Sequence, residues 1–162
     1  MINDAVENVL MSFDGELMID VSEVATVRKE NTLMHALMLL QNVGYSSIPV
    51  TDNRQKLCGI ITMPAILRGI QDEVKYDWDK LNEMKVGDVM CPPDMVLRED
   101  FTLEDVLRVL VNHNFSCVVD DKNTFLGIIT RKNMLQRMNY MAHEFDNFYE
   151  AYPFVSEYVG IV

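Results

Sequence analysis

The sequence has few of the residues from which metal centres and catalytic sites are built. Its three cysteines, Cys58, Cys91 and Cys117, include no pair at CxxC spacing, and its three histidines form no HExxH motif. Its seven glycines form no GxxxxGK[ST] phosphate loop, and no nucleophile–base pair stands out. These absences predict a protein that is not an enzyme and has no metal and no bound cofactor. They also predict reduced thiols in a cytoplasmic protein.

Positive charge and long apolar runs are also scarce. The 14 lysines and arginines are outnumbered by 25 acidic residues, which gives a formal net charge of −11. That balance argues against a nucleic acid partner, which needs a broad basic face. It still allows a small anionic ligand. Charges beyond a Debye length of ~8 Å are mostly screened, so a few local cations determine whether a site can bind an anion. No apolar run approaches the ~18 residues of a membrane span, and no signal peptide is evident, so we expect no membrane partner.

What the sequence does contain is an internal repeat. Residues 32–48 align with residues 102–118 with six identities in 17 positions, and residues 59–67 align with residues 127–135 with five in nine. A repeat determines the architecture before any single motif does. It also poses the functional question of where the two copies differ.

The local patterns predict the same β-α-β-β-α order in each copy. A threonine precedes each expected helix at the position that caps it, namely Thr32 (or its neighbour Asn31), Thr62, Thr102 and Thr130. Gly44 suits the left-handed end of the first of these helices, and we expect the last to end near Met141. The expected strands, chosen for alternation and β-branched residues, cover residues 24–27, 47–50, 57–61, 96–97, 118–119 and 126–129.

Two such units should form one module. A single unit of about 60 residues has too small a sheet to be stable alone. We therefore predict an α/β (α+β) fold in which two repeats pack sheet to sheet with pseudo-two-fold symmetry and share a core. The expected domains are an N-terminal helix (1–15), repeat one (16–71), a connecting segment (72–88), repeat two (89–138) and an aromatic C-terminal extension (139–162).

The C-terminal extension is acidic and contains seven aromatic residues: Tyr140, Phe145, Phe148, Tyr149, Tyr152, Phe154 and Tyr158. So many aromatic side chains in so short a span are not expected to stay bare in water. We expect them to pack across the module or onto a second subunit, with a protein partner as the alternative.

The two copies differ most at the start of their second helix. Repeat one continues from its capping threonine with the apolar stretch 63–65, whereas repeat two continues Thr130, Arg131, Lys132, Asn133. A helix N-terminus favours anions, and a charge-assisted bond from arginine to phosphate adds roughly 1.5–3 kcal/mol. The difference predicts one phosphate site. The alternatives are that Thr130 is only a cap and that the two cations are only solvated surface charges.

Tyr45, Ser46 and Ser47 are the candidates on the other repeat. Tyr45 could belong to the core, as its counterpart Phe115 suggests, or could stack on an adenine base for ~1–3 kcal/mol. The two serines could be strand-edge residues or hydrogen-bond donors to phosphate or base.

The repeated order of short motifs resembles a known family. The markers are two G-h-h-T turns (Gly59–Thr62 and Gly127–Thr130, where h is an apolar residue) and an aromatic-Ser segment after each long helix. With these, the chain resembles tandem CBS-domain pairs (Bateman modules), most of all the small stand-alone cyclic di-AMP-binding CBS proteins of Gram-positive bacteria. The resemblance implies a regulatory protein that forms a homodimer, acts on a protein partner and binds an adenine nucleotide (cyclic di-AMP, AMP or ATP). The positions that it implies for the ligand are Ala25, Tyr45, Ser46, Ser47, Arg131 and Lys132.

The chain departs from that family pattern at three positions. Glu23 stands where relatives can have a basic residue, and it would repel a nearby phosphate. Ala65 and Asn133 stand where many AMP- or ATP-binding pairs have an aspartate for the ribose hydroxyls. Ala65 and Asn133 make ordinary mononucleotide binding less expected than a ligand held through its phosphates and bases, whereas Glu23 weakens the transfer of the family's site to this chain. The three departures also leave open an alternative, a CBS-fold interaction module that binds no ligand.

Overall fold

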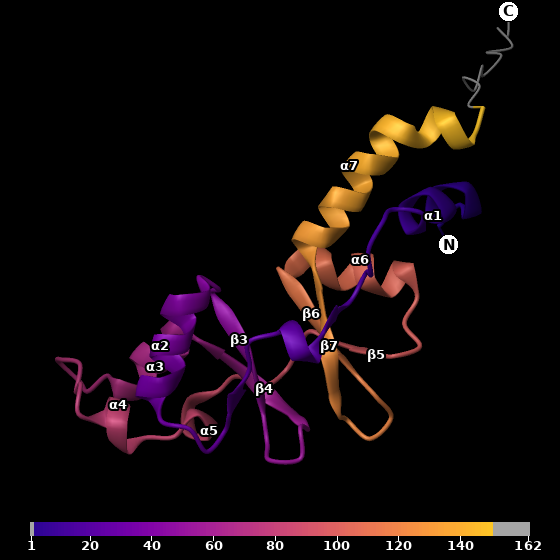
Figure 1. Ribbon diagram of the computed structural model, residues 1–162. Helices are drawn as coiled ribbons and strands as arrows, with labels where there is room; N and C mark the ends of the chain where they lie inside the picture. Colours follow the sequence, from indigo (N-terminus) through magenta and orange to yellow (C-terminus); the bar gives the residue numbers. More distant parts are fainter. Residues whose placement is uncertain (1, 151–162) are drawn as a thin grey trace, which may run out of the picture.

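The computed structural model describes residues 2–150. These residues form two lobes that meet through their sheets (Figure 1). The N-terminal helix α1 (Asp4–Met11) is followed by β1 (Ile19–Asp20) and the short 3-10 helix η1 (Val21–Glu23). One lobe then contains β2 (Val27–Arg28), α2 (Leu33–Val43), β3 (Ser47–Thr51), β4 (Leu57–Thr62) and α3 (Met63–Ile70). Two short helices, α4 (Lys80–Glu83) and α5 (Val86–Val89), form the connection. The other lobe contains β5 (Val96–Arg98), α6 (Leu103–Asn112), β6 (Phe115–Val119), β7 (Phe125–Thr130) and α7 (Arg131–Phe148).

Each repeat has the predicted β-α-β-β-α order. In repeat one, β2 pairs with β3 in parallel and β3 pairs with β4 antiparallel, and repeat two has the same arrangement in β5, β6 and β7. The strand β1 adds to the edge of β7, which makes the second sheet four-stranded. The segment after α5 follows the same path in repeat one, where Cys91 and Ile60 form an isolated bridge.

The first predicted strand is wrong in its position. The side chain of Asp20 accepts a 2.9 Å hydrogen bond from the amide of Ser22, and this cap starts η1. The chain therefore turns at Val21–Glu23, just before the expected strand, and Val27 and Arg28 are the residues that pair as β2.

The four threonine caps are confirmed. Each hydroxyl oxygen accepts a hydrogen bond from the amide three residues later, at 3.1–3.3 Å. Thr102 forms a full capping box with Asp105, which accepts from the Thr102 amide at 3.0 Å. Gly44 ends α2 in the left-handed conformation, with φ of 67°.

The core between the repeats is made by both sheets. Leu57 and Ile60 from β4 cluster with buried residues of the second sheet, namely Phe115, Cys117, Val119, Phe125 and Ile128. Each lobe also has its own cluster between its sheet and its helices. Because a fully buried aliphatic side chain contributes about 1.5–3 kcal/mol, the shared cluster ties the two units into one module.

The glycine of each G-h-h-T turn allows two backbones to meet. A Cβ atom on Gly59 would lie 2.6 Å from the carbonyl oxygen of Cys91. A Cβ atom on Gly127 would collide with the carbonyl oxygen of Ile19. Each glycine thus makes room for the segment that crosses its sheet before entering the other repeat.

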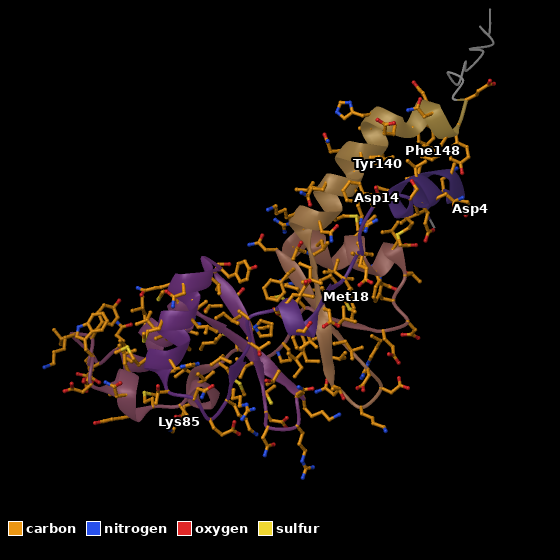
Figure 2. The ribbon with its side chains drawn as sticks, viewed as in Figure 1. Asp4, Asp14, Met18, Lys85, Tyr140 and Phe148 are labelled. Carbon is orange, nitrogen blue, oxygen red and sulfur yellow. The ribbon has the colours of Figure 1, made fainter. Side chains whose placement is uncertain are left out.

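The last helix is longer than expected. It continues beyond Met141 to Phe148 and packs against α1, so the first and last helices of the described residues lie side by side (Figure 1). The ring of Tyr140 meets the ring of Phe13 edge to face, with centroids 5.4 Å apart. Figure 2 shows Tyr140 beside the segment that contains Asp14. Part of the predicted aromatic extension therefore packs on the module, while Tyr152, Phe154 and Tyr158 lie outside the described residues.

Candidate ligand site

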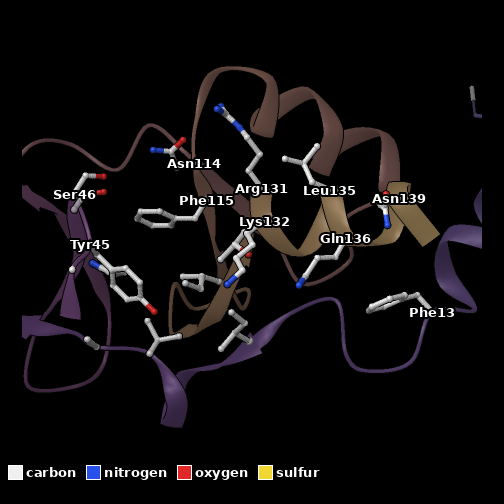
Figure 3. A pocket seen from close by; sticks show the side chains of 18 residues that line it. Phe13, Tyr45, Ser46, Asn114, Phe115, Arg131, Lys132, Leu135, Gln136 and Asn139 are labelled. Carbon is white, nitrogen blue, oxygen red and sulfur yellow. The ribbon is translucent and has the colours of Figure 1, made fainter. Parts of the chain in front are cut away.

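A cavity of about 1060 Å³ opens between the two repeats (Figure 3). Its walls include the turn between α2 and β3, the start of α7, and the segment before β2. All seven residues predicted for the site lie on it: Ala25, Tyr45, Ser46, Ser47, Thr130, Arg131 and Lys132. The pseudo-two-fold packing thus brings together side chains that are more than 80 residues apart in the sequence.

Tyr45 is held out of the core by the end of α2. Gly44, in its left-handed conformation, turns the chain so that Tyr45 and Ser46 precede β3 and face the cavity. Tyr45 is 54% exposed, whereas its counterpart Phe115 is 9% exposed and belongs to the shared core. Of the two interpretations of Tyr45, packing in the core is therefore wrong, and the ring is available to a ligand.

The start of α7 forms the opposite wall. The Thr130 hydroxyl accepts a 3.1 Å hydrogen bond from the Asn133 amide, so it caps the helix. Lys132 is exposed, and Figure 3 shows its side chain extending into the space between Tyr45 and Gln136. A cation at this position opposes the helix dipole, a local cost that a bound anion would offset.

The guanidinium group of Arg131 is hydrogen-bonded to the protein. Its Nε donates a 2.8 Å hydrogen bond to the carbonyl oxygen of Leu110, and Nη2 donates at 3.3 Å to that of Val111. These carbonyls lie at the end of α6, where backbone acceptors have no partner within the helix. Figure 3 shows the guanidinium directed away from Tyr45. Arg131 thus fastens α7 to α6, and a guanidinium has further donors for an anion.

Two of the departures from the family pattern now have a structural account. The Nδ2 of Asn133 donates 3.1 Å hydrogen bonds to the carbonyl oxygens of Glu16 and Leu17, so this side chain holds the entering backbone. Glu23 lies beside Asp20 and Ser22 on a separate cavity of about 410 Å³. Its carboxylate is therefore not a wall of the larger cavity.

Sequence reasoning missed several residues of the site. Gln136 and Asn139 follow Lys132 at helical spacing, and that spacing could have identified them as one face of α7. Phe13 also lines the cavity, but no local pattern announces it, because its position depends on contacts with α7. Asn114, beside Phe115, completes this side of the wall.

Two further properties of the described part of the chain concern metal binding and membrane crossing. Among residues 2–150, no three histidine, cysteine, aspartate or glutamate side chains gather closely enough to hold a metal ion. Within the same residues, no helix has both the length and the apolar character that crossing a bilayer requires.

The fold and the repeat define a family. A family model described as CBS domain matches residues 15–72 and 86–140, and the chain therefore belongs to the CBS-domain family. The mixed α/β architecture agrees with this assignment and confirms the predicted fold class.

Individual relatives refine the assignment. The sequence is 32% identical over 139 residues to Cyclic di-AMP receptor B of Bacillus subtilis (strain 168), which covers 86% of this chain and 95% of that protein. The structure is similar to CbpB of Streptococcus agalactiae, with a TM-score of 0.84 and 27% identity over 94% of this chain and 96% of the other. It is also similar to Listeria monocytogenes CbpB in complex with c-di-AMP, with a TM-score of 0.73 and 38% identity over 80% and 98%.

Proposed function

We propose that this protein is a cytoplasmic, non-enzymatic receptor that binds an adenine nucleotide between its repeats, with cyclic di-AMP as the first candidate. The observation that supports this most strongly is the convergence of an exposed tyrosine, hydroxyl groups and a cation on one cavity. Small-molecule sites commonly enclose about 300–1,000 Å³. At about 1060 Å³, this cavity has room for a ligand larger than one nucleotide.

The groups on the walls match the parts of such a ligand. The ring of Tyr45 can stack on an adenine, a contact that contributes ~1–3 kcal/mol. Ser46 and Ser47 supply hydroxyl donors on the same wall. Lys132 lies within the first turn of α7, where free backbone N–H groups and its ammonium group together favour phosphate.

The relatives support the choice of ligand. One relative carries the name Cyclic di-AMP receptor B, and similar structures include CbpB in complex with c-di-AMP. We extend that ligand to this chain because the alignment with Cyclic di-AMP receptor B covers 86% of this chain and 95% of that protein. We further propose a homodimer that changes its docking onto a protein partner when the ligand binds.

Calorimetric titration tests the proposal. Cyclic di-AMP, AMP, ADP and ATP are each titrated into micromolar protein, and we expect saturable heat with the tightest binding for cyclic di-AMP. Tyr45→Ala should weaken binding at least about fivefold, as expected for a loss of ~1–3 kcal/mol. Trp78→Ala removes another exposed aromatic side chain, which does not line the cavity, and should leave affinity unchanged. Absence of heat with all four nucleotides would overturn the proposal.

A second function is favoured by one observation. The Arg131 guanidinium already bonds to two carbonyl groups of the protein, so it can fulfil a structural role without an anion. A CBS-fold interaction module that acts only through protein contacts would share this feature. Its signature is partner binding that no adenine nucleotide alters, which the same titrations, repeated with a partner present, would detect.

A further inference from the structure

We propose that Phe13 is a second aromatic platform in the cavity, and that it selects a ligand with two aromatic rings over a ligand with one. This inference rests on the proposed function, because it concerns the same cavity. It adds a residue from the N-terminal segment (residues 4–18), which lies outside the two internally similar blocks of the sequence.

The placement of Phe13 is the first argument. Figure 3 shows Tyr45 and Phe13 at opposite ends of the cavity, with Lys132 and Gln136 between them. A molecule in which two bases are joined through phosphates has the same order of parts: ring, anionic linker, ring. A mononucleotide can reach one aromatic side chain and the cation, and it leaves the other end empty.

The fixing of Phe13 is the second argument. Arg137 is 1% exposed, and its Cζ lies over the Phe13 ring, 5.3 Å from the centroid. Its Nη1 donates to the carbonyl oxygens of Leu10 at 3.0 Å and Phe13 at 3.4 Å, and Nη2 donates to that of Gly15 at 2.6 Å. Together with the edge-to-face contact of Tyr140, these bonds hold Phe13 at the cavity before any ligand arrives. Such preorganisation lowers the entropic cost of binding.

The comparison of the repeats is the third argument. Asn133 and Arg137 clamp the N-terminal segment onto α7, whereas the residues 68 positions earlier are Ala65 and Gly69. In repeat one the corresponding segment is α5, which packs directly against the backbone of α3. A Cβ atom on Gly69 of α3 would collide with the side chain of Val89 in α5. Small residues therefore suffice to dock a segment at this place. Burying a guanidinium costs free energy unless its donors are hydrogen-bonded. Because Arg137 is present in repeat two alone, we infer that it has a role beyond docking the segment, which is to position Phe13.

Titrations of Phe13 variants with cyclic di-AMP and AMP test the inference. Phe13→Ala and Phe13→Leu should weaken the binding of cyclic di-AMP at least about fivefold, because each removes one base-stacking surface. Phe13→Trp should retain near-wild-type affinity. AMP affinity should change less than about twofold in all three variants, since one base can use Tyr45 alone. Met11→Ala is the matched control, an exposed side chain of the same segment that does not line the cavity.

The outcomes separate this inference from the proposed function. Wild-type protein that binds none of the nucleotides overturns both. Wild-type protein that binds cyclic di-AMP, with Phe13→Leu binding equally well, overturns the platform alone. Equal losses for AMP and cyclic di-AMP in Phe13→Leu would also overturn it, because they would indicate general damage to the cavity. If Phe13→Ala does not fold, the Leu and Trp variants retain apolar bulk and keep the test decisive.

A fluorescence measurement gives an independent readout. Phe13→Trp in a Trp78→Phe background places the sole tryptophan at the proposed platform. Cyclic di-AMP should change its emission upon stacking, and AMP at the same occupancy should change it much less. Equal responses to the two ligands would contradict the proposal.

Discussion

Leu57 and Asn123 are joined by two hydrogen bonds across the two repeats. The Leu57 amide donates to the Asn123 carbonyl oxygen at 3.1 Å, and the Asn123 Nδ2 donates to the Leu57 carbonyl oxygen at 2.9 Å. The symmetric contact links Phe125 to Gln55, whose carbonyl oxygen accepts at 2.9 Å. Gln55 and Asn123 both have a left-handed backbone, with φ of 60° and 62°. The β3–β4 and β6–β7 hairpins are thus hydrogen-bonded to each other, and these bonds help to fix the relative orientation of the two sheets.

Each of these hairpins depends on one aspartate, which predicts an acid-sensitive fold. The Asp120 carboxylate accepts from the amides of Thr124 at 2.6 Å and Lys122 at 2.9 Å, and Asp52 accepts likewise from Lys56 and Arg54. These bonds lower the pKa of both carboxyl groups, with the bonds from Thr124 and Lys56 contributing most. A lowered folded pKa gives stability that is present above the unfolded pKa of about 3.9 and is lost as pH falls through the folded pKa.

The free energy of unfolding should therefore fall below about pH 4, and Asp120→Asn should make that fall shallower. Urea unfolding between pH 2.5 and pH 7 measures it. Asp121→Asn removes the same formal charge one residue away and serves as the control. Superimposable acid profiles for wild type and Asp120→Asn would show that the loop carboxylate has no such role.

Gly127→Ala should destabilise the module. The added methyl group would collide with the Ile19 carbonyl oxygen and would push β1 off the edge of β7. Overpacking of this kind costs about 1–3 kcal/mol, which a urea midpoint resolves easily. Gly87→Ala is the control, because its methyl group would lie 3.3 Å from the Lys29 carbonyl oxygen and needs only a small shift. Equal midpoints for the two variants would contradict the account.

Lys132 and Arg131 should differ in what they support. Lys132→Gln should weaken nucleotide binding about tenfold and reduce its salt dependence, with the urea midpoint unchanged, because we propose that this exposed ammonium binds the ligand's phosphate. Arg131→Gln removes two bonds to α6 and should also lower the free energy of unfolding by about 1–3 kcal/mol. Calorimetry at two salt concentrations and urea unfolding separate the effects. A Lys132→Gln variant with wild-type affinity would remove Lys132 from the site.

Cys117 should resist alkylation. It is fully buried in the shared core, and burial raises the pKa of its thiol to about 12. The reactive thiolate is therefore almost absent at pH 8. Iodoacetamide should label the partly exposed Cys91 in the native protein and should reach Cys117 only in urea, as peptide mass spectrometry would show. Native labelling of both residues at one rate would mean that the core opens readily.

The sequence predicted the parts of the fold that have local signals. Each capping threonine acts on an amide three residues away, so Thr62 and Thr130 are visible in the sequence alone. The internal repeat likewise implied two sheets with a shared core. The error at residues 24–27 has a local cause as well, since the side chain of Asp20 turns the chain before the strand can begin.

The parts of the site that escaped prediction depend on distant contacts. Phe13 reaches the cavity because Arg137 bonds to carbonyl groups of the N-terminal segment more than 120 residues away. The hydrogen bond from Arg131 to the carbonyl oxygen of Leu110 likewise depends on where α6 ends in space. No composition or periodicity within one segment encodes such pairings.

The packing of the N-terminal segment on α7 has a consequence for synthesis. Phe13 and Tyr45 leave the ribosome early, and Lys132 and Arg137 leave it more than 80 residues after Tyr45. A nascent chain can order its first sheet, but the cavity gains its opposite wall and its clamp only after α7 emerges. Under the proposed function, nucleotide therefore cannot assist folding of the first repeat during translation, and it would stabilise only those molecules in which both repeats have met.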